Sequence, residues 1–133
     1  MTGRGRGPLA AALLLACCAP APPCPSDLAL IERFRAQPAL FEQLAREPGN
    51  AELRQRLGVA ETRVLEDGLV LLLAWQLDFA GPGGAVKGYA RSPRPPEGLV
   101  ESIDAAASPG EAGTRQLYRR IEGQWYVYYA SSD

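Results

Sequence analysis

The stretch that decides the fold is TRVLEDGLVLLLAWQLDF, residues 62–79. Apolar and polar residues alternate along it with the period of two that β-strands show, and Asp67-Gly68 separates its two parts. Asp-Gly is favoured in two-residue hairpin turns because both turn residues need a positive φ. The sequence therefore predicts a hairpin of strands 62–66 and 69–79, in which Leu71 pairs with Val64.

The longer strand of this hairpin predicts where the core lies. Alternation places five large apolar side chains on one face, which we expect to be the core face: Leu71, Leu73, Trp75, Leu77 and Phe79. Gln76 and Asp78 face the other way. Because residues 69–75 are apolar on both faces, we expect that part of the strand to be covered on both sides.

Upstream of the hairpin, the apolar period is that of a helix. Five apolar side chains mark a helix from about residue 27 to 46: Leu28, Ile31, Phe34, Phe41 and Leu44. Pro38 falls on the same stripe, and since the stripe keeps its phase, we expect Pro38 to kink the helix rather than end it. Asn50 is predicted to cap a short second helix that stops at Gly58.

Downstream of the hairpin, the chain again has short strand patterns. They predict a third strand at 85–91, a short helix within 99–106, and a closing hairpin of 116–121 and 125–129. Helices followed by antiparallel strands are typical of the α+β class. We therefore expect one α+β domain, in which a kinked helix and a short second helix pack on an antiparallel meander of four to five strands.

The N-terminal residues 1–16 have the features of a secretory signal peptide. Arg4 and Arg6 precede an apolar run at 9–16 that is shorter than the roughly 20 residues a membrane-spanning helix needs. Leu14-Leu15-Ala16-Cys17 resembles the bacterial lipobox. The resemblance implies that a diacylglyceryl group is attached to the Cys17 thiol and that the chain is cut before Cys17. It also implies acylation of the new amine, and two or more acyl chains make a stable membrane anchor.

The lipobox divides the chain into a discarded segment, a tether and a domain. Residues 17–25 become the lipidated cysteine and a proline-rich, semi-rigid tether, and residues 26–133 form the domain. No Asp follows Cys17, and the resemblance to Gram-negative lipoproteins then implies the periplasmic face of the outer membrane. Cys18 and Cys24 either close a small disulfide loop in the oxidising envelope or stay as free thiols.

Composition narrows the range of functions. Without Arg4 and Arg6, the chain has 12 basic and 15 acidic residues and a net charge of −3, so no basic excess favours nucleic acid. Lys87 is the sole lysine among the basic residues, which we ascribe to coding bias. The chain has no histidine, and residues 26–133 have no cysteine. We therefore expect a protein that is not an enzyme and has no metal or cofactor.

Carboxylates are the remaining groups that could perform acid–base chemistry. Asp78, Glu101 and Asp104 would have to converge for a hydrolytic pair, and the competing interpretation is solvated surface charge.

The last strand is aromatic on both faces. Trp125 and Tyr129 point one way, and Tyr126 and Tyr128 point the other. The candidate binding surface consists of four residues on this and the neighbouring strand: Tyr118, Arg119, Tyr126 and Tyr128. The competing interpretation is that these rings fill a core from both sides of the sheet.

The C-terminal part also resembles a group of small uncharacterised bacterial proteins, many of which have lipoprotein-type signals. The shared pattern is a Lys-Gly-Tyr strand at 87–89, Pro95-Pro96, the segment LVESID at 99–104, and Gly-Gln-Trp-Tyr at 123–126. This resemblance implies no activity, ligand or catalytic residue.

Three functions follow as expectations. The first is a lipid-anchored envelope protein that acts as a non-catalytic binding module for a protein or another envelope ligand. The second is a periplasmic inhibitor or immunity-type protein that presents loop 81–84 or 91–96, and the remote third is a carboxylate-dependent hydrolase. A concave, tyrosine-lined sheet face favours the first, a rigid protruding loop the second, and an acidic pair in a cleft the third.

Overall fold

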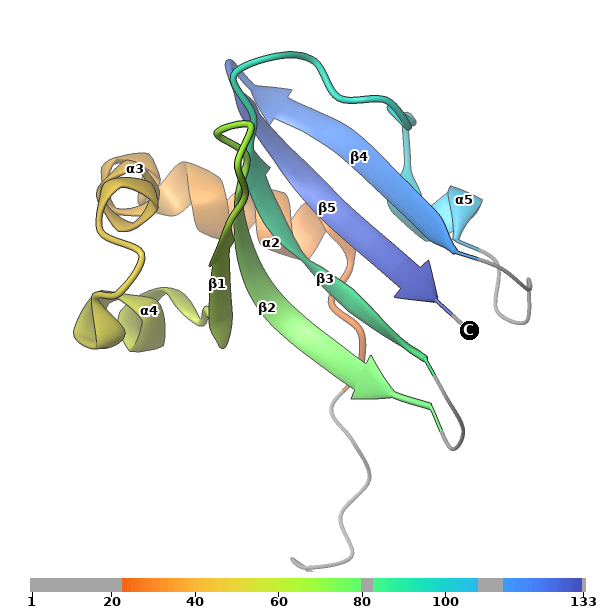
Figure 1. The fold of residues 1–133 in the computed structure, drawn as a ribbon, viewed down its shortest axis with the longest axis horizontal. Helices are drawn as coiled ribbons and strands as arrows, with labels where there is room; N and C mark the ends of the chain where they lie inside the picture. The colour runs from red at the N-terminus through yellow and green to blue at the C-terminus, as the bar shows by residue number, and fades with distance from the viewer. Residues whose placement is uncertain (1–22, 80–82, 108–113, 133) are drawn as a thin grey trace, which may run out of the picture.

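The computed structural model of the protein describes residues 23–79, 83–107 and 114–132. These residues form an α+β fold, as predicted, with helices packed on an antiparallel sheet (Figure 1). The helices are α2 (Asp27–Ala36), α3 (Pro38–Arg46), α4 (Ala51–Leu57) and the short α5 (Ile103–Ala106). The strands are β1 (Glu61–Val64), β2 (Val70–Asp78), β3 (Gly84–Arg91), β4 (Arg115–Glu122) and β5 (Trp125–Ser132). No helix in these ranges is long and apolar enough to cross a membrane.

The segment predicted as one kinked helix consists of two helices, so that prediction was wrong. α2 begins after Ser26, whose hydroxyl accepts the Ala29 N–H at 3.1 Å, and it ends before Gln37, which has φ −145° and ψ 54°. Pro38 disfavours helical dihedrals in the residue before it and is the first residue of α3. The helices still share one apolar face, because the Phe34 and Phe41 rings lie 5.3 Å apart.

The second helix begins and ends where the sequence predicts. The Asn50 side chain accepts the Leu53 N–H at 3.0 Å, and Gly58 follows α4 in the left-handed conformation with φ 71°.

The β1–β2 hairpin is confirmed, but its register differs by one residue. Val64 pairs with Val70 instead of Leu71. The Leu65 and Leu69 backbones are hydrogen-bonded across a three-residue loop, and Gly68 has the positive φ of 85° that such a loop needs at its last position. Asp67 has no positive φ, so the two-residue turn predicted for Asp-Gly does not form.

A β-bulge in β2 overturns the predicted single core face. The pairing of β2 with β3 shifts between Leu73 and Trp75, so one extra residue lies opposite β3. Leu71 and Leu73 belong to one apolar cluster, whereas Trp75 pairs with Lys87, whose side chain lies on the opposite face. The alternation of side chains therefore reverses within the strand, which a strict period of two does not predict.

The sheet order is β1-β2-β3-β5-β4, so the chain departs from a simple meander at its C-terminal end. β4 lies at the edge, and β5 returns between β3 and β4. In Figure 1 the helix α2 lies behind the sheet, α3 extends to the left beyond β1, and the other face is turned toward the viewer.

Each face of the sheet has its own apolar cluster. The helix-side cluster joins helix residues such as Leu30 and Phe34 to Leu72, Tyr89 and Val127 of the sheet. The cluster on the other face, here called the second face, consists of Leu71, Leu73, Ala90, Tyr118, Tyr126 and Tyr128. The expectation that β2 is covered on both sides is thus confirmed for residues 70–73, which are all buried.

Gly88 lies opposite the bulge, and we expect Gly88→Ala to destabilise the fold by about 1–3 kcal/mol. A Cβ at this position would overlap the carbonyl oxygen of Leu72 and stand 2.8 Å from the Ala74 nitrogen. Urea unfolding of Gly88→Ala and of Gly49→Ala measures the effect, because a Cβ at Gly49 would meet nothing within 4 Å. Equal unfolding midpoints for the two variants would contradict the close approach of the strands.

Candidate functional site

The most deeply buried charges of the described residues form an ion cluster at the start of α2. Lys87, in the middle of β3, is 1% exposed, and Asp27, the first residue of α2, is 0% exposed. The Lys87 Nζ lies 2.8 Å from Asp27 Oδ1 and 2.8 Å from Asp104 Oδ1. Arg119 of β4 approaches from the other side, with its Nη1 3.1 Å from Asp27 Oδ2. We call these four residues the anchor cluster.

The two aspartates of the anchor cluster bind each other's helix ends. Asp27 Oδ2 accepts the Ile103 N–H at 2.7 Å, and Asp104 Oδ2 accepts the Asp27 N–H at 2.9 Å. Each carboxylate thus satisfies a backbone donor that the start of the other helix leaves unpaired. The cluster thereby joins α2 and α5 to the sheet strands that carry Lys87 and Arg119.

The electrostatics of the cluster keep both buried partners charged. Burial alone would raise the pKa of Asp27, but hydrogen bonds from Lys87 and Arg119 outweigh it, and this pKa lies below its usual value. Burial alone would lower the pKa of Lys87, but the hydrogen bonds to Asp104 and Asp27 raise it above its usual value. The sole lysine therefore has a structural role, which composition did not reveal.

The carboxylates considered for acid–base chemistry do not converge. Asp104 is paired with Lys87 on the helix side, and Glu101 is exposed. Asp78 pairs with Gly84, three positions along β3 from Lys87, and strand alternation directs the two side chains to opposite faces.

The candidate binding surface predicted from the sequence divides into two parts. Tyr118, Tyr126 and Tyr128 come together on the second face, with the Tyr118 ring centroid 6.2 Å from that of Tyr126 and 5.2 Å from that of Tyr128. All three are at most 5% exposed, so they form a buried cluster, and burial raises the pKa of Tyr118 to about 12. Arg119 lies on the helix side, paired with Asp27.

The β1–β2 loop approaches the proline-rich turn that follows β3. A Cβ on Gly68, in the β1–β2 loop, would lie 3.5 Å from Pro93 Cγ, so this loop and the proline-rich turn are in contact. The charge of Asp67, in the same loop, is close enough to contribute to the raised pKa of Tyr118, after the larger effect of burial.

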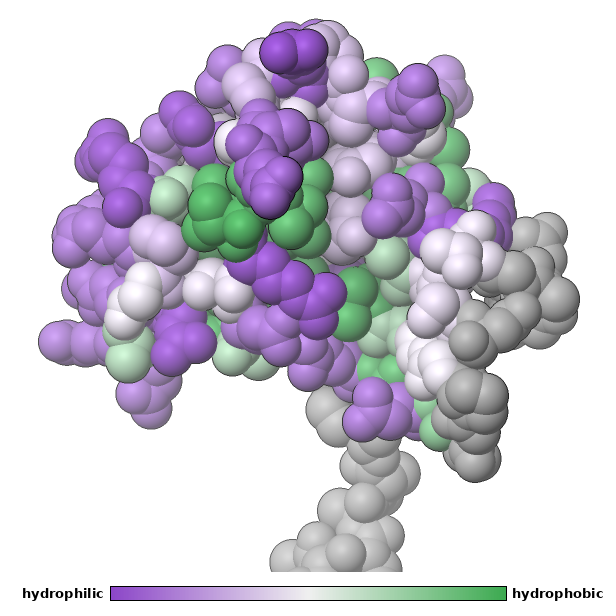
Figure 2. Space-filling view, in the orientation of Figure 1, coloured by the Kyte–Doolittle hydropathy of each residue, from purple (hydrophilic) through white to green (hydrophobic). Residues whose placement is uncertain are grey.

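Part of the second face forms a groove of about 390 Å³. Tyr128, Val86 and Ala130 belong to its lining, and the polar side chains around them come from several strands: Arg63, Gln76, Asp78, Thr114, Gln116, Ser131 and Ser132. On the face shown in Figure 2, apolar surface lies between such polar side chains. We call this feature the sheet groove.

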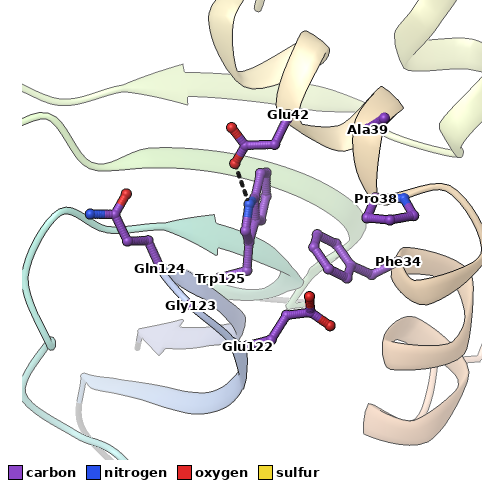
Figure 3. Close-up of a pocket in the computed structure, with 8 residues that line it drawn as sticks. All are labelled: Phe34, Pro38, Ala39, Glu42, Glu122, Gly123, Gln124 and Trp125. Atoms are coloured by element: carbon purple, nitrogen blue, oxygen red, sulfur yellow. Dashed lines mark hydrogen bonds between the residues drawn. The ribbon is translucent and has the colours of Figure 1, made fainter.

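A second pocket, of about 340 Å³, lies where α2 and α3 meet the β4–β5 turn (Figure 3). Glu42 Oε1 accepts the Trp125 Nε1–H at 2.6 Å and the Arg91 Nε–H at 2.9 Å. Burial would raise the pKa of Glu42, but these hydrogen bonds outweigh it and hold the pKa below its usual value. Because this oxygen already has two protein partners, we interpret Glu42 as a tie between α3 and the sheet.

The cysteines contribute little to the described structure. Cys24 is exposed and free, and Cys17 and Cys18 lie outside the described residues, as do Gly81 and Pro82 of the predicted loop. The disulfide and lipidation predictions therefore remain predictions.

No protein-family model, curated protein or solved structure matches the chain.

Proposed function

We propose that this protein is a lipid-anchored component of the cell envelope, attached through Cys17, and that its α+β domain is a non-catalytic binding module. The observation that carries the proposal is Leu14-Leu15-Ala16-Cys17 after a basic and then apolar segment, with a proline-rich tether behind it. In this proposal the lipid holds the domain at the periplasmic face of the outer membrane.

The anchor cluster supports the tethered role. Asp27 is the first residue of α2 and follows the tether almost directly, and it is bonded to Lys87 of β3 and Arg119 of β4. A force applied through the tether would thus reach the sheet through buried ion pairs rather than through α2 alone.

The sheet groove supports the binding role. It is a concave region of the second face with Tyr128 in its lining, and it combines apolar surface with side chains that can donate and accept hydrogen bonds. The ionisable groups at the centre of the fold are engaged in the pairs described above, which tie secondary-structure elements together.

The anchor is tested by Cys17→Ala in the full chain expressed in a bacterial host with an outer membrane. We expect the wild-type protein in the membrane fraction and the variant in the soluble fraction, because without the acyl chains only the weak contacts of the domain hold it to lipid. Immunoblots of both fractions measure the result, and Cys24→Ala is the control that should remain with the membrane. A Cys17→Ala variant that stays membrane-bound would refute the anchor.

One observation favours the inhibitor or immunity-type alternative. The Ser92 N–H donates to the Gln124 carbonyl oxygen at 2.9 Å, and the Ser92 hydroxyl donates to the Arg94 carbonyl oxygen. These bonds hold a turn that exposes Pro93, Arg94 and Pro95. Capture of an envelope enzyme that is lost in Arg94→Ala, together with inhibition of that enzyme, would favour this alternative over the binding module.

A further inference from the structure

The sheet groove is a hollow on the second face, and small-ligand sites are found in clefts of this kind. Its lining comes from all five strands, and its volume of about 390 Å³ lies within the range of roughly 300–1,000 Å³ of ligand pockets. Toward the opposite end of the second face, the Gly68 loop approaches Pro93.

The charges of the groove lining cancel. The lining has one guanidinium, Arg63, and one carboxylate, Asp78. Arg63 is also ion-paired with Glu61, which in turn accepts a hydrogen bond from Gln76 at 3.1 Å. The lining itself has one charge of each sign, and Glu61, outside the lining, adds a negative charge beside Arg63, so the groove disfavours an anion such as a phosphate.

The uncharged polar groups determine the class of ligand. Gln76 and Gln116 are exposed and present carboxamides, each of which can donate and accept, and Ser132 adds a hydroxyl group. Tyr128 is buried, and its hydroxyl is hydrogen-bonded to the Gln116 side chain. The hydroxyl and amide groups of a sugar also donate and accept, so they can satisfy such a lining without any net charge. Val86 and Ala130 offer small apolar surfaces on which the C–H face of a sugar ring can lie.

The location on a sheet face disfavours an extended peptide. A peptide that adds to a sheet as a strand needs a free edge, where backbone N–H and C=O groups are unpaired. Gly84 in the groove pairs with Asp78 on one side and with Ser132 on the other, so β3 has no free edge there. The centre of the groove therefore gives a peptide no backbone to pair with, and a strand could add only along β1 or β4, the edge strands of the sheet.

We propose that the sheet groove binds a neutral oligosaccharide. The sugar hydroxyl and amide groups bond to Gln76 and Gln116, and a ring face packs over Val86 and Ala130. The inference deepens the proposed binding module and rests on it, and it names both the site and the chemical class of the ligand.

The test titrates the full chain, solubilised in detergent, with two probes by isothermal calorimetry. The probes are a chitin oligosaccharide, which has acetamide groups, and a cellulose oligosaccharide, which has hydroxyl groups alone. A neutral peptide of similar length is titrated in parallel. Gln76→Ala and Gln116→Ala are the test variants, and Gln55→Ala, exposed on α4 in the helix layer, is the matched control.

We expect saturable binding of at least one oligosaccharide, weakened roughly fivefold by each test variant, which is what the loss of one neutral hydrogen bond produces. Gln55→Ala should bind as the wild type does, and thermal melting of all variants verifies that they are folded. Three results would overturn the inference: no saturable binding of either oligosaccharide, unchanged binding in both test variants, or equal binding of the peptide. The calorimetry does not depend on the lipid anchor. A negative calorimetry result would therefore overturn the sugar site alone, whereas the fractionation of Cys17→Ala tests the proposed anchor.

Discussion

Replacement of Asp27 by alanine is expected to lower the free energy of unfolding by about 3–5 kcal/mol, the usual cost of breaking a buried ion pair. The substitution leaves the Lys87 ammonium buried with Asp104 as its remaining carboxylate, and it removes the acceptor of the Ile103 N–H. Urea unfolding followed by circular dichroism measures the loss. Glu32→Ala, on the exposed side of the same helix, should change stability by less than about 0.5 kcal/mol.

A double-mutant cycle with Lys87→Met separates the ion pair from the other contacts of Asp27. Since Met removes the buried charge and retains most of the side-chain volume, the double variant should be more stable than the sum of the single losses implies. Additive losses would show that Lys87 and Asp27 do not stabilise each other, and an Asp27→Ala cost below about 1 kcal/mol would show that the anchor cluster does not stabilise the fold.

Tyr126→Ala is expected to lower the free energy of unfolding by about 3–5 kcal/mol, because it removes a ring from a packed cluster. Tyr126 is 4% exposed, lies opposite Ala90 in the sheet, and contacts the edge of the Tyr118 ring. Its replacement opens a cavity in the cluster of the second face, to which the described helices contribute no side chain. The thermal midpoint and the urea midpoint both report the loss.

Two control variants test whether the loss of stability in Tyr126→Ala comes from the loss of a buried ring. Tyr126→Phe keeps the ring and should retain most of the stability. Phe79→Ala removes a ring that is 41% exposed at the end of β2 and should cost far less than Tyr126→Ala. If Tyr126→Ala has the same thermal midpoint as the wild type, the tyrosines are not part of a core. That result would favour the interpretation of these residues as an exposed binding surface.

The candidate site was only partly predictable. Strand alternation correctly placed Tyr126 and Tyr128 on the opposite face of the sheet from Trp125. The face toward which a side chain points depends only on its position along the strand. The burial of the tyrosines confirms the competing interpretation of the sequence, that these rings fill a core from both sides of the sheet, over the interpretation as an exposed binding surface. Lys87 and Asp27 had no local signal at all, because they are 60 residues apart in the chain and meet only in the tertiary structure.

The sequence alone determined the α+β class, the cap at Asn50, the stop at Gly58 and the position of the hairpin around Gly68. These features depend on hydrogen bonds and dihedral angles within a few residues, which local sequence specifies. The tertiary structure alone decided the β2 bulge, the placement of β5 between β3 and β4, the anchor cluster and the sheet groove. Each of these depends on which distant segments share a buried volume, and packing and desolvation act on those segments only when the whole sheet has formed.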